Sequence, residues 1–435
     1  MKICIMGLGY IGLPTAAMFA THGQKIIGVD INESIVNILN EGKIHIDEPY
    51  LDILVQGAVR SGNLTAKTMP EEADAFIIAV PTPITAEKKA DMNFVINAAE
   101  AIIPYLRKGN IVILESTSPP GTVENILVPI LKKSGLKIGT ELFVAHSPER
   151  VLPGKILIEM MENNRIIGGI NRKSTEMVRD LYKIFVRGEI FLTDATTAEM
   201  TKLVENTFRD VNIAFANELA KVCEKSSISV WEVINLANKH PRVNIHNPGP
   251  GVGGHCIAVD PWFLVESFPD TARLIKSSRE LNDSMPHHVF DKIKAILAVG
   301  KKAEKKVISI MGITYKPNVD DIRESPIIDM INLLEKDGGY DIRIMDPYIK
   351  SFKYLCKSEY DMFSGSDLIV MAVNHDSFNK TNFGKLYPLM RTKNVLDLRN
   401  VIDGEKLSEL GFSYYCLGQG QNIEAPKSEV FLQPA

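Results

Sequence analysis

The segment Lys2-Ile-Cys-Ile-Met-Gly7-Leu-Gly9-Tyr10-Ile11-Gly12 joins a short apolar run to three closely spaced glycines. A helical pattern follows as far as Thr21, and a second apolar segment ends at Asp30. A GxGxxG motif that follows a strand, opens a helix and leads to an acid after the next strand is typical of a dinucleotide site. The glycines let a pyrophosphate approach the N–H groups at the helix N-terminus. The alternative is a glycine turn that binds no ligand.

Asp30 would accept hydrogen bonds from the hydroxyls of the adenosine ribose, and its charge would repel a 2′-phosphate. We therefore expect NAD rather than NADP as the cofactor.

Three further apolar segments, 75–80, 110–116 and 142–145, continue the alternation of strands with helical stretches. This alternation predicts a parallel sheet with helices on both faces, and hence a doubly wound, Rossmann-like α/β domain. Thr82, Thr117 and Glu149 follow these three segments, and ligands of such sheets bind beyond the carboxyl ends of the strands. Each of the three could instead cap a helix.

A long helix is predicted from Ala195 onward. Its apolar stripe, about seven turns long, consists of Val204, Phe208, Val211, Phe215, Leu219 and Val222. A helix of this length can connect two domains and offer a face to a second subunit. Lys202, Asn206 and Arg209 share another face, which is either part of a site or a solvated surface with ion pairs such as Glu199–Lys202.

A glycine- and proline-rich loop leads from Asn247 to Gly254 and is followed at once by His255 and Cys256. Such a loop contributes little to a core, so we expect it to present the thiol to a ligand. With His255 nearby and Asp260 four residues on, Cys256 is a candidate nucleophile. A buried, inert cysteine in a turn is the alternative. A further helical region covers about 272–299, with a break near Pro286.

A second α/β unit is predicted after the polar boundary at 300–306. Its strands are expected at 307–312, 342–345, 367–373, 394–398 and 412–417, without a second GxGxxG motif. The segment that follows the first of them carries Tyr315, Lys316 and Arg323, and its two cations could bind phosphate or carboxylate. They could equally form ion pairs with Asp320, Asp321 and Glu324. The tail after Gly418 is expected to be loosely ordered.

The composition limits the classes of function. A chain of 435 residues should divide into two or three domains, and a net charge of −4 gives no basic bias toward nucleic acid. The five cysteines form no CxxC pair, so neither a disulfide framework nor a metal site is expected, and a reducing compartment, the cytoplasm, fits. We find no signal peptide at the start and no apolar run of 18 residues, so no membrane span is expected.

These motifs, in this order over about residues 1–418, resemble the UDP-sugar 6-dehydrogenases (the UDP-glucose/GDP-mannose dehydrogenase family). The resemblance rests on the glycine fingerprint, Val80-Pro-Thr-Pro83, Glu115-Ser-Thr117, Lys202 with Asn206, Tyr315-Lys316 with Arg323, and two longer segments. The two segments, Ser147-Pro-Glu-Arg-Val-Leu-Pro-Gly154 and Gly253-Gly-His-Cys-Ile-Ala-Val-Asp-Pro-Trp-Phe263, are most similar to the UDP-N-acetylmannosamine dehydrogenases. The glucose enzymes have a second glutamate where Pro153 stands here, and usually serine where His255 stands, which argues against UDP-glucose.

The resemblance implies two Rossmann-like domains joined by a central helical domain. We expect an NAD-binding domain at 1–194, a helical dimerisation domain at 195–300, a UDP-sugar-binding domain at 301–420 and a tail at 421–435. The expected assembly is a homodimer or a dimer-based oligomer that binds neither nucleic acid nor membrane.

The resemblance also implies a four-electron oxidation of UDP-N-acetylmannosamine at C6 with two NAD, in the synthesis of surface polysaccharide or glycan precursors. Cys256 would form a thiohemiacetal and then a thioester, Lys202 and Asn206 would stabilise the oxyanion, and Asp260 or Glu149 would act as base. The implied substrate contacts are Lys202 and Asn206 again, with Arg150, Val151, Arg209, His240, Arg242, Gly253, Tyr315 and Lys316. The implied NAD contacts are Gly7, Gly9, Tyr10, Ile11, Gly12, Asp30, Thr82, Thr117 and Arg323.

Three alternatives remain open. UDP-N-acetylglucosamine or UDP-glucose could be the preferred substrate. A two-electron dehydrogenase on the same fold would need no cysteine. A sugar-nucleotide sensor without catalysis would tolerate the loss of Cys256 or Lys202, and both residues are present.

Overall fold

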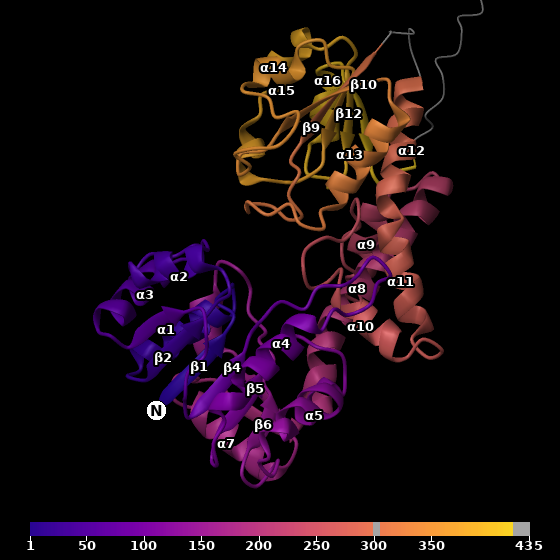
Figure 1. Ribbon diagram of the computed structural model, residues 1–435. Helices are drawn as coiled ribbons and strands as arrows, with labels where there is room; N and C mark the ends of the chain where they lie inside the picture. Colours follow the sequence, from indigo (N-terminus) through magenta and orange to yellow (C-terminus); the bar gives the residue numbers. More distant parts are fainter. Residues whose placement is uncertain (299–304, 421–435) are drawn as a thin grey trace, which may run out of the picture. The chain divides into compact units, whose positions relative to one another are not determined.

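The computed structural model describes residues 1–298 and 305–420, and divides into two compact units (Figure 1). The first unit comprises Met1–Asn206 and Trp262–Thr271, and the second comprises Thr207–Pro261 and the chain from Ala272 onward. The predicted tail at 421–435 and most of the polar boundary at 300–306 lie outside the described residues.

The first unit is built on an eight-stranded sheet in the order β3-β2-β1-β4-β5-β6-β7-β8. Its strands are β1 (Lys2–Met6), β2 (Lys25–Val29), β3 (Leu64–Lys67), β4 (Ala75–Ile78), β5 (Ile111–Leu114), β6 (Phe143–His146), β7 (Arg165–Gly169) and β8 (Ile190–Asp194). The first six in sheet order are parallel, as predicted, while β7 pairs antiparallel with β6. The doubly wound fold is therefore confirmed, with an antiparallel extension that the sequence pattern did not indicate.

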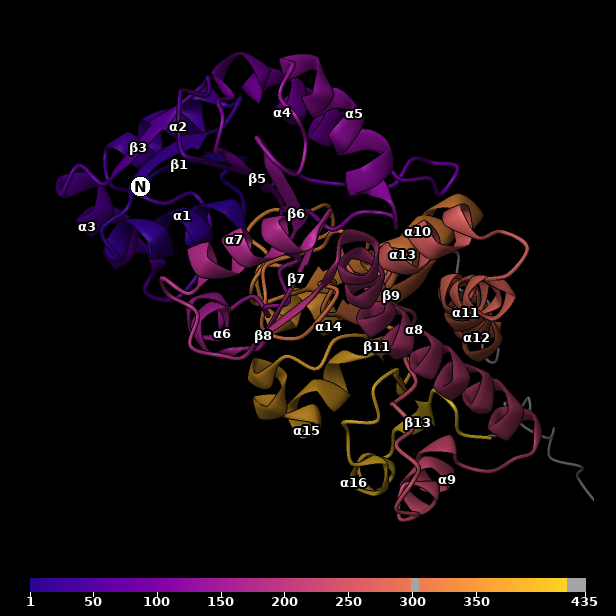
Figure 2. The same cartoon turned by 90° about the horizontal axis from the view of Figure 1, so that it is seen from below.

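Helices cover both faces of this sheet (Figure 2). One face carries α1 (Gly12–Thr21), α2 (Glu33–Asn40), α3 (Leu51–Arg60), α6 (Ile156–Glu162) and α7 (Arg172–Tyr182), and the other carries α4 (Asn93–Ile102), the π-helical turn η2 (Val123–Leu127) and α5 (Val128–Leu131). The short turns η1 (Ile103–Tyr105) and η3 (Lys132–Ser134) also belong to this unit. Strand alternation explains the two layers, because Ile3 and Ile5 of β1 face one set of helices while Cys4 and Met6 face the other.

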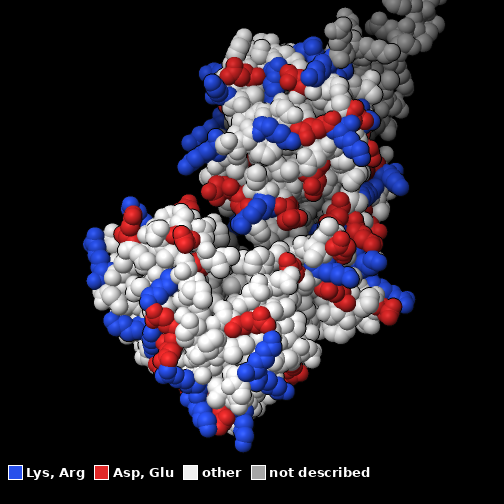
Figure 3. Space-filling model, in the orientation of Figure 1, with Lys and Arg blue, Asp and Glu red and all other residues white. Residues whose placement is uncertain are grey.

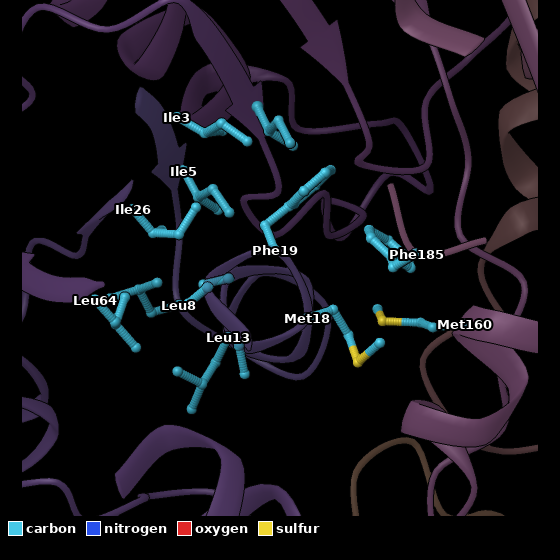
Figure 4. Packing of buried hydrophobic residues seen from close by; sticks show 14 of the residues in the cluster. Ile3, Ile5, Leu8, Leu13, Met18, Phe19, Ile26, Leu64, Met160 and Phe185 are labelled. Atoms are coloured by element: carbon cyan, nitrogen blue, oxygen red, sulfur yellow. The ribbon is translucent and has the colours of Figure 1, made fainter. Parts of the chain in front are cut away.

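The larger of these two cores surrounds Phe19 of α1. Figure 4 shows Phe19 between Phe185 and the strand that carries Ile3 and Ile5, and the rings of Phe19 and Phe185 meet edge to face at 4.8 Å. Burial of each such side chain contributes about 1.5–3 kcal/mol to folding. The helix that begins at the glycine fingerprint is therefore firmly held against the sheet.

The predicted long helix is α8, Ala195–Lys225, and its apolar stripe is largely exposed in the single chain. Val204, Phe208, Phe215 and Val222 are 48%, 65%, 48% and 52% exposed. These four side chains form an exposed apolar row along α8.

The second unit contains a five-stranded, all-parallel sheet in the order β10-β9-β11-β12-β13. Its strands are β9 (Lys306–Met311), β10 (Tyr340–Met345), β11 (Leu368–Met371), β12 (Asn394–Asp397) and β13 (Ser413–Cys416). One face packs against α12 (Met285–Ala298) and α13 (Pro326–Asp337), and the other against α14 (Glu359–Phe363), α15 (Phe383–Leu386) and α16 (Gly404–Glu409). The second Rossmann-like unit is thus confirmed.

The remaining helices are α9 (Val230–Ala237), α10 (Asp260–Ser267), α11 (Arg273–Asp283), η4 (Asp376–Lys380) and η5 (Tyr387–Leu389). The predicted break near Pro286 separates α11 from α12, and Pro286 occupies the first turn of α12, where its missing N–H costs no hydrogen bond.

On the face shown in Figure 3, Lys and Arg are interspersed with Asp and Glu on both units, in keeping with the small net charge of −4. Among the helices of the described residues, none is both long and apolar enough to cross a membrane.

Candidate active site

The glycine fingerprint forms a turn too tight for side chains at two of its three glycines. Gly7 has a φ of +92°, and a Cβ on it would lie 2.7 Å from the carbonyl oxygen of Ala79. A Cβ on Gly12 would lie only 1.9 Å from the carbonyl oxygen of Gly7. Gly9 differs, because a Cβ there would meet nothing within 4 Å. The chain thus leaves open space at Gly9, where a ligand can reach the backbone.

The N-terminus of α1 beside this space suits an anion. No side chain caps it, and its first turn contains no acidic residue, so the positive end of the helix dipole is not neutralised there. Tyr10 and Ile11 lie within the turn, between Gly9 and Gly12; Tyr10 is 37% exposed and Ile11 is half-buried.

Asp30 lies directly after β2, beside the glycine turn. Its Oδ2 accepts a hydrogen bond from the N–H of Leu8 at 3.1 Å, and its Oδ1 accepts one from the N–H of Asn32 at 3.0 Å. Each carboxylate oxygen has a second lone pair, so the held carboxylate can still accept the two hydroxyls of a ribose. The residues present therefore fit the adenosine end of NAD.

Thr82 and Thr117 lie beyond β4 and β5, and both are half-buried. Neither caps a helix, because the next helices have Met92 and Thr122 at their N-caps. The hydroxyl of Ser116 donates to the carbonyl oxygen of Val80 at 2.7 Å and so ties the two strand ends together. The alternative of helix caps is excluded, and the polar strand ends line one edge of the sheet.

Glu149 follows β6 at the same edge and is almost fully buried. Its Oε1 accepts the N–H of Arg150 at 2.8 Å, and its Oε2 forms an ion pair with Arg165 of β7. Arg150 in turn pairs with Glu205 of α8, and Val151 is half-buried. The Ser147-Pro-Glu-Arg segment is therefore anchored on two sides, by β7 and by α8.

The suggested ion pair between Glu199 and Lys202 is wrong. Glu199 is fully buried and accepts hydrogen bonds from the N–H groups of Gly121 at 2.5 Å and Val123 at 2.8 Å. Burial raises its pKa to about 7, although these backbone donors favour the charged form. Spacing along the helix could not reveal that a loop distant in sequence would supply two donors. Lys202 is half-buried and Asn206 is 8% exposed, on the same helix.

The cysteine loop, residues 247–256, packs tightly against the segment that begins the second sheet. A Cβ on Gly254, whose φ is +85°, would lie 2.8 Å from the ring of Tyr315, and one on Gly253 would lie 2.9 Å from the Cβ of Tyr315. A Cβ on Gly251 would lie 2.7 Å from the side chain of Pro326. Glycine is thus required for this approach. The structure thus brings the cysteine loop into contact with the segment that carries Tyr315, more than 50 residues further along the sequence.

Contrary to expectation, part of this loop belongs to the core: residues 248–250 are buried. Asn217 of α8 accepts the N–H of Gly249 at 2.8 Å through its Oδ1, and a Cβ on Gly249 would lie 2.7 Å from a guanidinium nitrogen of Arg399. The small residues at 248–250 allow neighbouring segments to pack closely around this part of the loop. Cys256, at the other end of the loop, remains exposed. Sequence reasoning singled out neither Asn217 nor Arg399.

Cys256 is exposed, which excludes the alternative of a buried, inert thiol. The Nε2 of neighbouring His255 lies 3.2 Å from the Oδ2 of Asp321, and Arg323 donates to the same carboxylate at 2.9 and 2.8 Å. Burial favours a raised pKa for Asp321, but the hydrogen bonds from His255 and Arg323 outweigh it and hold the pKa well below its usual range. The ion pair considered for Arg323 is therefore present, with Asp321.

Asp260 begins α10 and is 2% exposed, and its N–H donates to the carbonyl oxygen of Cys256 at 2.8 Å. One helical turn thus joins the thiol-bearing residue to the candidate base. Lys316 lies 5.6 Å from the centre of the Tyr315 ring. The remaining candidates, Arg209, His240 and Arg242, are exposed.

The comparisons with known proteins cover nearly the whole chain. Residues 1–186, 196–284 and 309–404 match the NAD binding domain, the central domain and the UDP binding domain of the UDP-glucose/GDP-mannose dehydrogenase family. The chain is 49% identical over 428 residues to a UDP-N-acetyl-D-mannosamine dehydrogenase of Methanococcus maripaludis, covering 96% of this chain and 97% of that one. It is 45% identical over 419 residues to an NDP-N-acetyl-D-galactosaminuronic acid dehydrogenase of Ralstonia solanacearum, covering 93% and 97%.

Among solved structures, the UDP-D-ManNAc dehydrogenase of Pyrococcus horikoshii superimposes with a TM-score of 0.90 at 39% identity, over 97% of this chain and all of that one.

Proposed function

Since the chain belongs to the UDP-glucose/GDP-mannose dehydrogenase family, we propose that it oxidises UDP-N-acetyl-D-mannosamine at C6 to UDP-N-acetyl-D-mannosaminuronic acid. The observation that carries this proposal is the exposed Cys256 at the end of a loop that packs closely against Tyr315. The match at 49% identity to a dehydrogenase of this sugar supports the choice of substrate.

The chemistry explains why a thiol is needed. NAD, when bound, supplies the hydride acceptor. The first oxidation removes a hydride and a proton from the C6 alcohol and gives an aldehyde, which has no second hydride to lose while its carbon stays trigonal. The thiolate of Cys256 adds to C6 and forms a tetrahedral thiohemiacetal. Loss of a second hydride gives a thioester, and attack by water releases the acid and the thiolate.

The other residues of the site would stabilise charge and move protons. Lys202 and Asn206, as a cation and an amide on one helix, would hold the oxygen of C6 while it carries negative charge. Asp260, one turn from Cys256, would take the proton of the alcohol or of the attacking water. Glu149 is the second base, since each of its carboxylate oxygens has a lone pair beyond those used by Arg150 and Arg165.

We place the NAD contacts at the glycine turn, Asp30, Thr82 and Thr117 in the first unit, together with Arg323. The UDP-sugar would contact Arg150 and Val151, then Arg209, His240 and Arg242, and Gly253, Tyr315 and Lys316. Arg242 is exposed and would reach the substrate of a neighbouring subunit. We assign the NAD-binding domain to 1–194, the central domain to 195–300 and the UDP-sugar-binding domain to 301–420. We also expect the protein in the cytoplasm, and cell fractionation would test this.

Substrate preference tests this proposal. We expect kcat/KM with NAD to be highest for UDP-N-acetylmannosamine, lower for UDP-N-acetylglucosamine and UDP-N-acetylgalactosamine, and very low for UDP-glucose. Each misplaced group costs about 1–3 kcal/mol in transition-state binding, so the epimers should differ by about tenfold to a hundredfold. UDP-N-acetylgalactosamine is included because of the relative from Ralstonia solanacearum. A higher kcat/KM for any other sugar would refute the substrate, though not the class of reaction.

The exposed stripe on α8 supports a homodimer, because four large apolar side chains face solvent along one helix. Two copies that pack these stripes against each other would bury them. We expect the wild type to sediment as a dimer or a multiple of one, and Phe208→Asp to sediment as a monomer at the same concentration. Phe94→Asp, at a 40% exposed phenylalanine outside the stripe, is the matched control and should leave the assembly unchanged. A wild-type monomer at micromolar concentration would contradict the proposal.

A further inference from the structure

The first unit contains a buried cluster of charged and hydroxyl side chains, of which the reaction scheme above uses only Glu149. We call it the Arg165 cluster, and it consists of Thr15, Glu115, Ser147, Glu149, Arg165 and Tyr182. Arg165 is 4% exposed and Glu115 2%. Charged side chains are rarely buried without a partner, so their pairing must be accounted for.

Arg165 contacts both carboxyl groups of the cluster, but unequally. One guanidinium nitrogen forms the ion pair with Glu149. The other donates to the hydroxyl of Ser147 at 3.1 Å and lies 3.5 Å from Oε1 of Glu115, too far for a good hydrogen bond. The guanidinium carbon lies 4.2 Å from the centre of the Tyr182 ring. The cation is thus directed at Glu149 and is held there by an aromatic face.

Glu115 receives neutral donors instead. The hydroxyl of Tyr182 donates to its Oε1 at 2.8 Å, and that of Thr15 donates to its Oε2 at 3.1 Å. The charged groups that face it are Arg165 and Glu149, and Tyr182 is the other titratable group. Burial, together with the charge of Glu149, raises the pKa of Glu115 to about 7, against the attraction of Arg165. The two buried carboxyl groups, Glu115 and Glu149, therefore share one buried cation, Arg165.

We propose that Arg165 is a positioning residue that keeps Glu149 ionised and correctly aimed, and that Glu115 carries the proton of the cluster in the active state. This inference rests on the proposed function for the role of Glu149 as a base. When Glu115 loses its proton, its carboxylate competes with Glu149 for the guanidinium of Arg165. This competition weakens the ion pair between Arg165 and Glu149. Because Thr15 lies in α1, the cluster also ties the helix of the glycine fingerprint to the Ser147-Pro-Glu segment.

The proton on Glu115 can be observed directly. Glu115→Gln keeps the size of the side chain and an oxygen acceptor but cannot ionise. The infrared difference spectrum of wild type minus E115Q should contain the C=O stretch of a protonated carboxyl at pH 6, and this band should fade as the pH rises to 8.5. The subtraction removes other buried acids such as Glu199. If the difference spectrum shows only a carboxylate at pH 6, the proposal is overturned.

The same proton should govern stability. The pKa of Glu115 is about 7 in the folded protein and about 4.5 in the unfolded chain, so the folded state binds this proton more tightly than the unfolded chain does. The resulting stability is fully present below pH 4.5 and is lost as the pH rises to about 7. The melting temperature of the wild type should therefore fall relative to that of E115Q between pH 5 and pH 8. A constant difference over this range would overturn the proposal.

The positioning role is tested with Arg165→Lys, which keeps the charge but loses the planar fork. We expect kcat to fall about tenfold or more, with KM for the sugar nucleotide and for NAD within about twofold, since the residue acts on the base and not on binding. Arg172→Lys, at an exposed arginine of α7, is the matched control and should change neither. If R165K keeps the wild-type kcat, or if only its KM changes, Arg165 is not a positioning residue for Glu149.

The tests separate this inference from the proposed function. If R165K does not fold, the infrared and melting comparisons of E115Q still decide the matter, since neither needs a turnover assay. A wild type that oxidises none of the UDP-sugars would refute the proposed function, while the protonated band of Glu115 would remain.

Discussion

Replacing Cys256 with alanine is expected to reduce the overall rate of acid formation by about 10³-fold or more, while NAD and the UDP-sugar still bind with nearly wild-type affinity. The thiol is exposed at the end of its loop, whereas the packing of that loop depends on its glycines and on Asn217, Tyr315 and Pro326. Removal of the sulfur atom therefore leaves the architecture intact but prevents covalent capture of the aldehyde. Steady-state production of uronic acid and calorimetric titration with each ligand would measure the two effects.

Cys356→Ala is the matched control, because Cys356 is a free, half-exposed thiol of the second unit outside the cysteine loop. It should leave both turnover and binding unchanged. If Cys256→Ala still forms uronic acid at nearly the wild-type rate, the thiohemiacetal has no place in the mechanism. If it loses binding of the sugar nucleotide instead, Cys256 serves recognition.

Gly9→Ala is expected to lose affinity for NAD without losing stability, whereas Gly12→Ala is expected to lose both. A methyl group at Gly9 meets nothing within 4 Å, so the protein should fold and melt as the wild type does. The same methyl group would occupy the space left for the pyrophosphate of NAD, and the affinity for NAD should fall by at least about tenfold, or about 1.4 kcal/mol. At Gly12 the methyl group would lie 1.9 Å from the carbonyl oxygen of Gly7, so the turn itself must distort.

We therefore expect Gly12→Ala to destabilise the first unit by about 3 kcal/mol or more, in addition to losing NAD. Thermal melting and NAD titration of the two variants side by side separate the effects. Wild-type NAD affinity in Gly9→Ala would show that the cofactor does not approach the backbone at this turn.

Much of the fold could be predicted because its signals are local. The apolar strands, the glycine turn with Asp30, the long helix and the break at Pro286 are each encoded in a few consecutive residues, and all of them occur in the structure. The antiparallel strand β7 was not predicted, because its pairing with β6 depends on a partner strand and not on its own residues.

The position of an exposed site residue such as Cys256 could be predicted from its local motif. The partners of buried side chains could not be predicted in this way. A surface ion pair of Glu199 was one of two alternatives, because helix spacing alone cannot show that two backbone N–H groups of a distant loop lie against this residue. Arg165 stands alone in an apolar strand, and only the structure shows two carboxyl groups beside it. The one available signal was the presence of a charged residue in an otherwise buried strand.

We propose that a single active site performs two successive oxidations, with one covalent capture of the substrate by Cys256 between them. The most direct measurement is the number of NADH molecules formed per molecule of UDP-N-acetylmannosamine consumed, determined at completion with the product identified by mass spectrometry. We predict two NADH and the uronic acid, with no free aldehyde. One NADH per sugar, with the aldehyde as the product, would contradict the account.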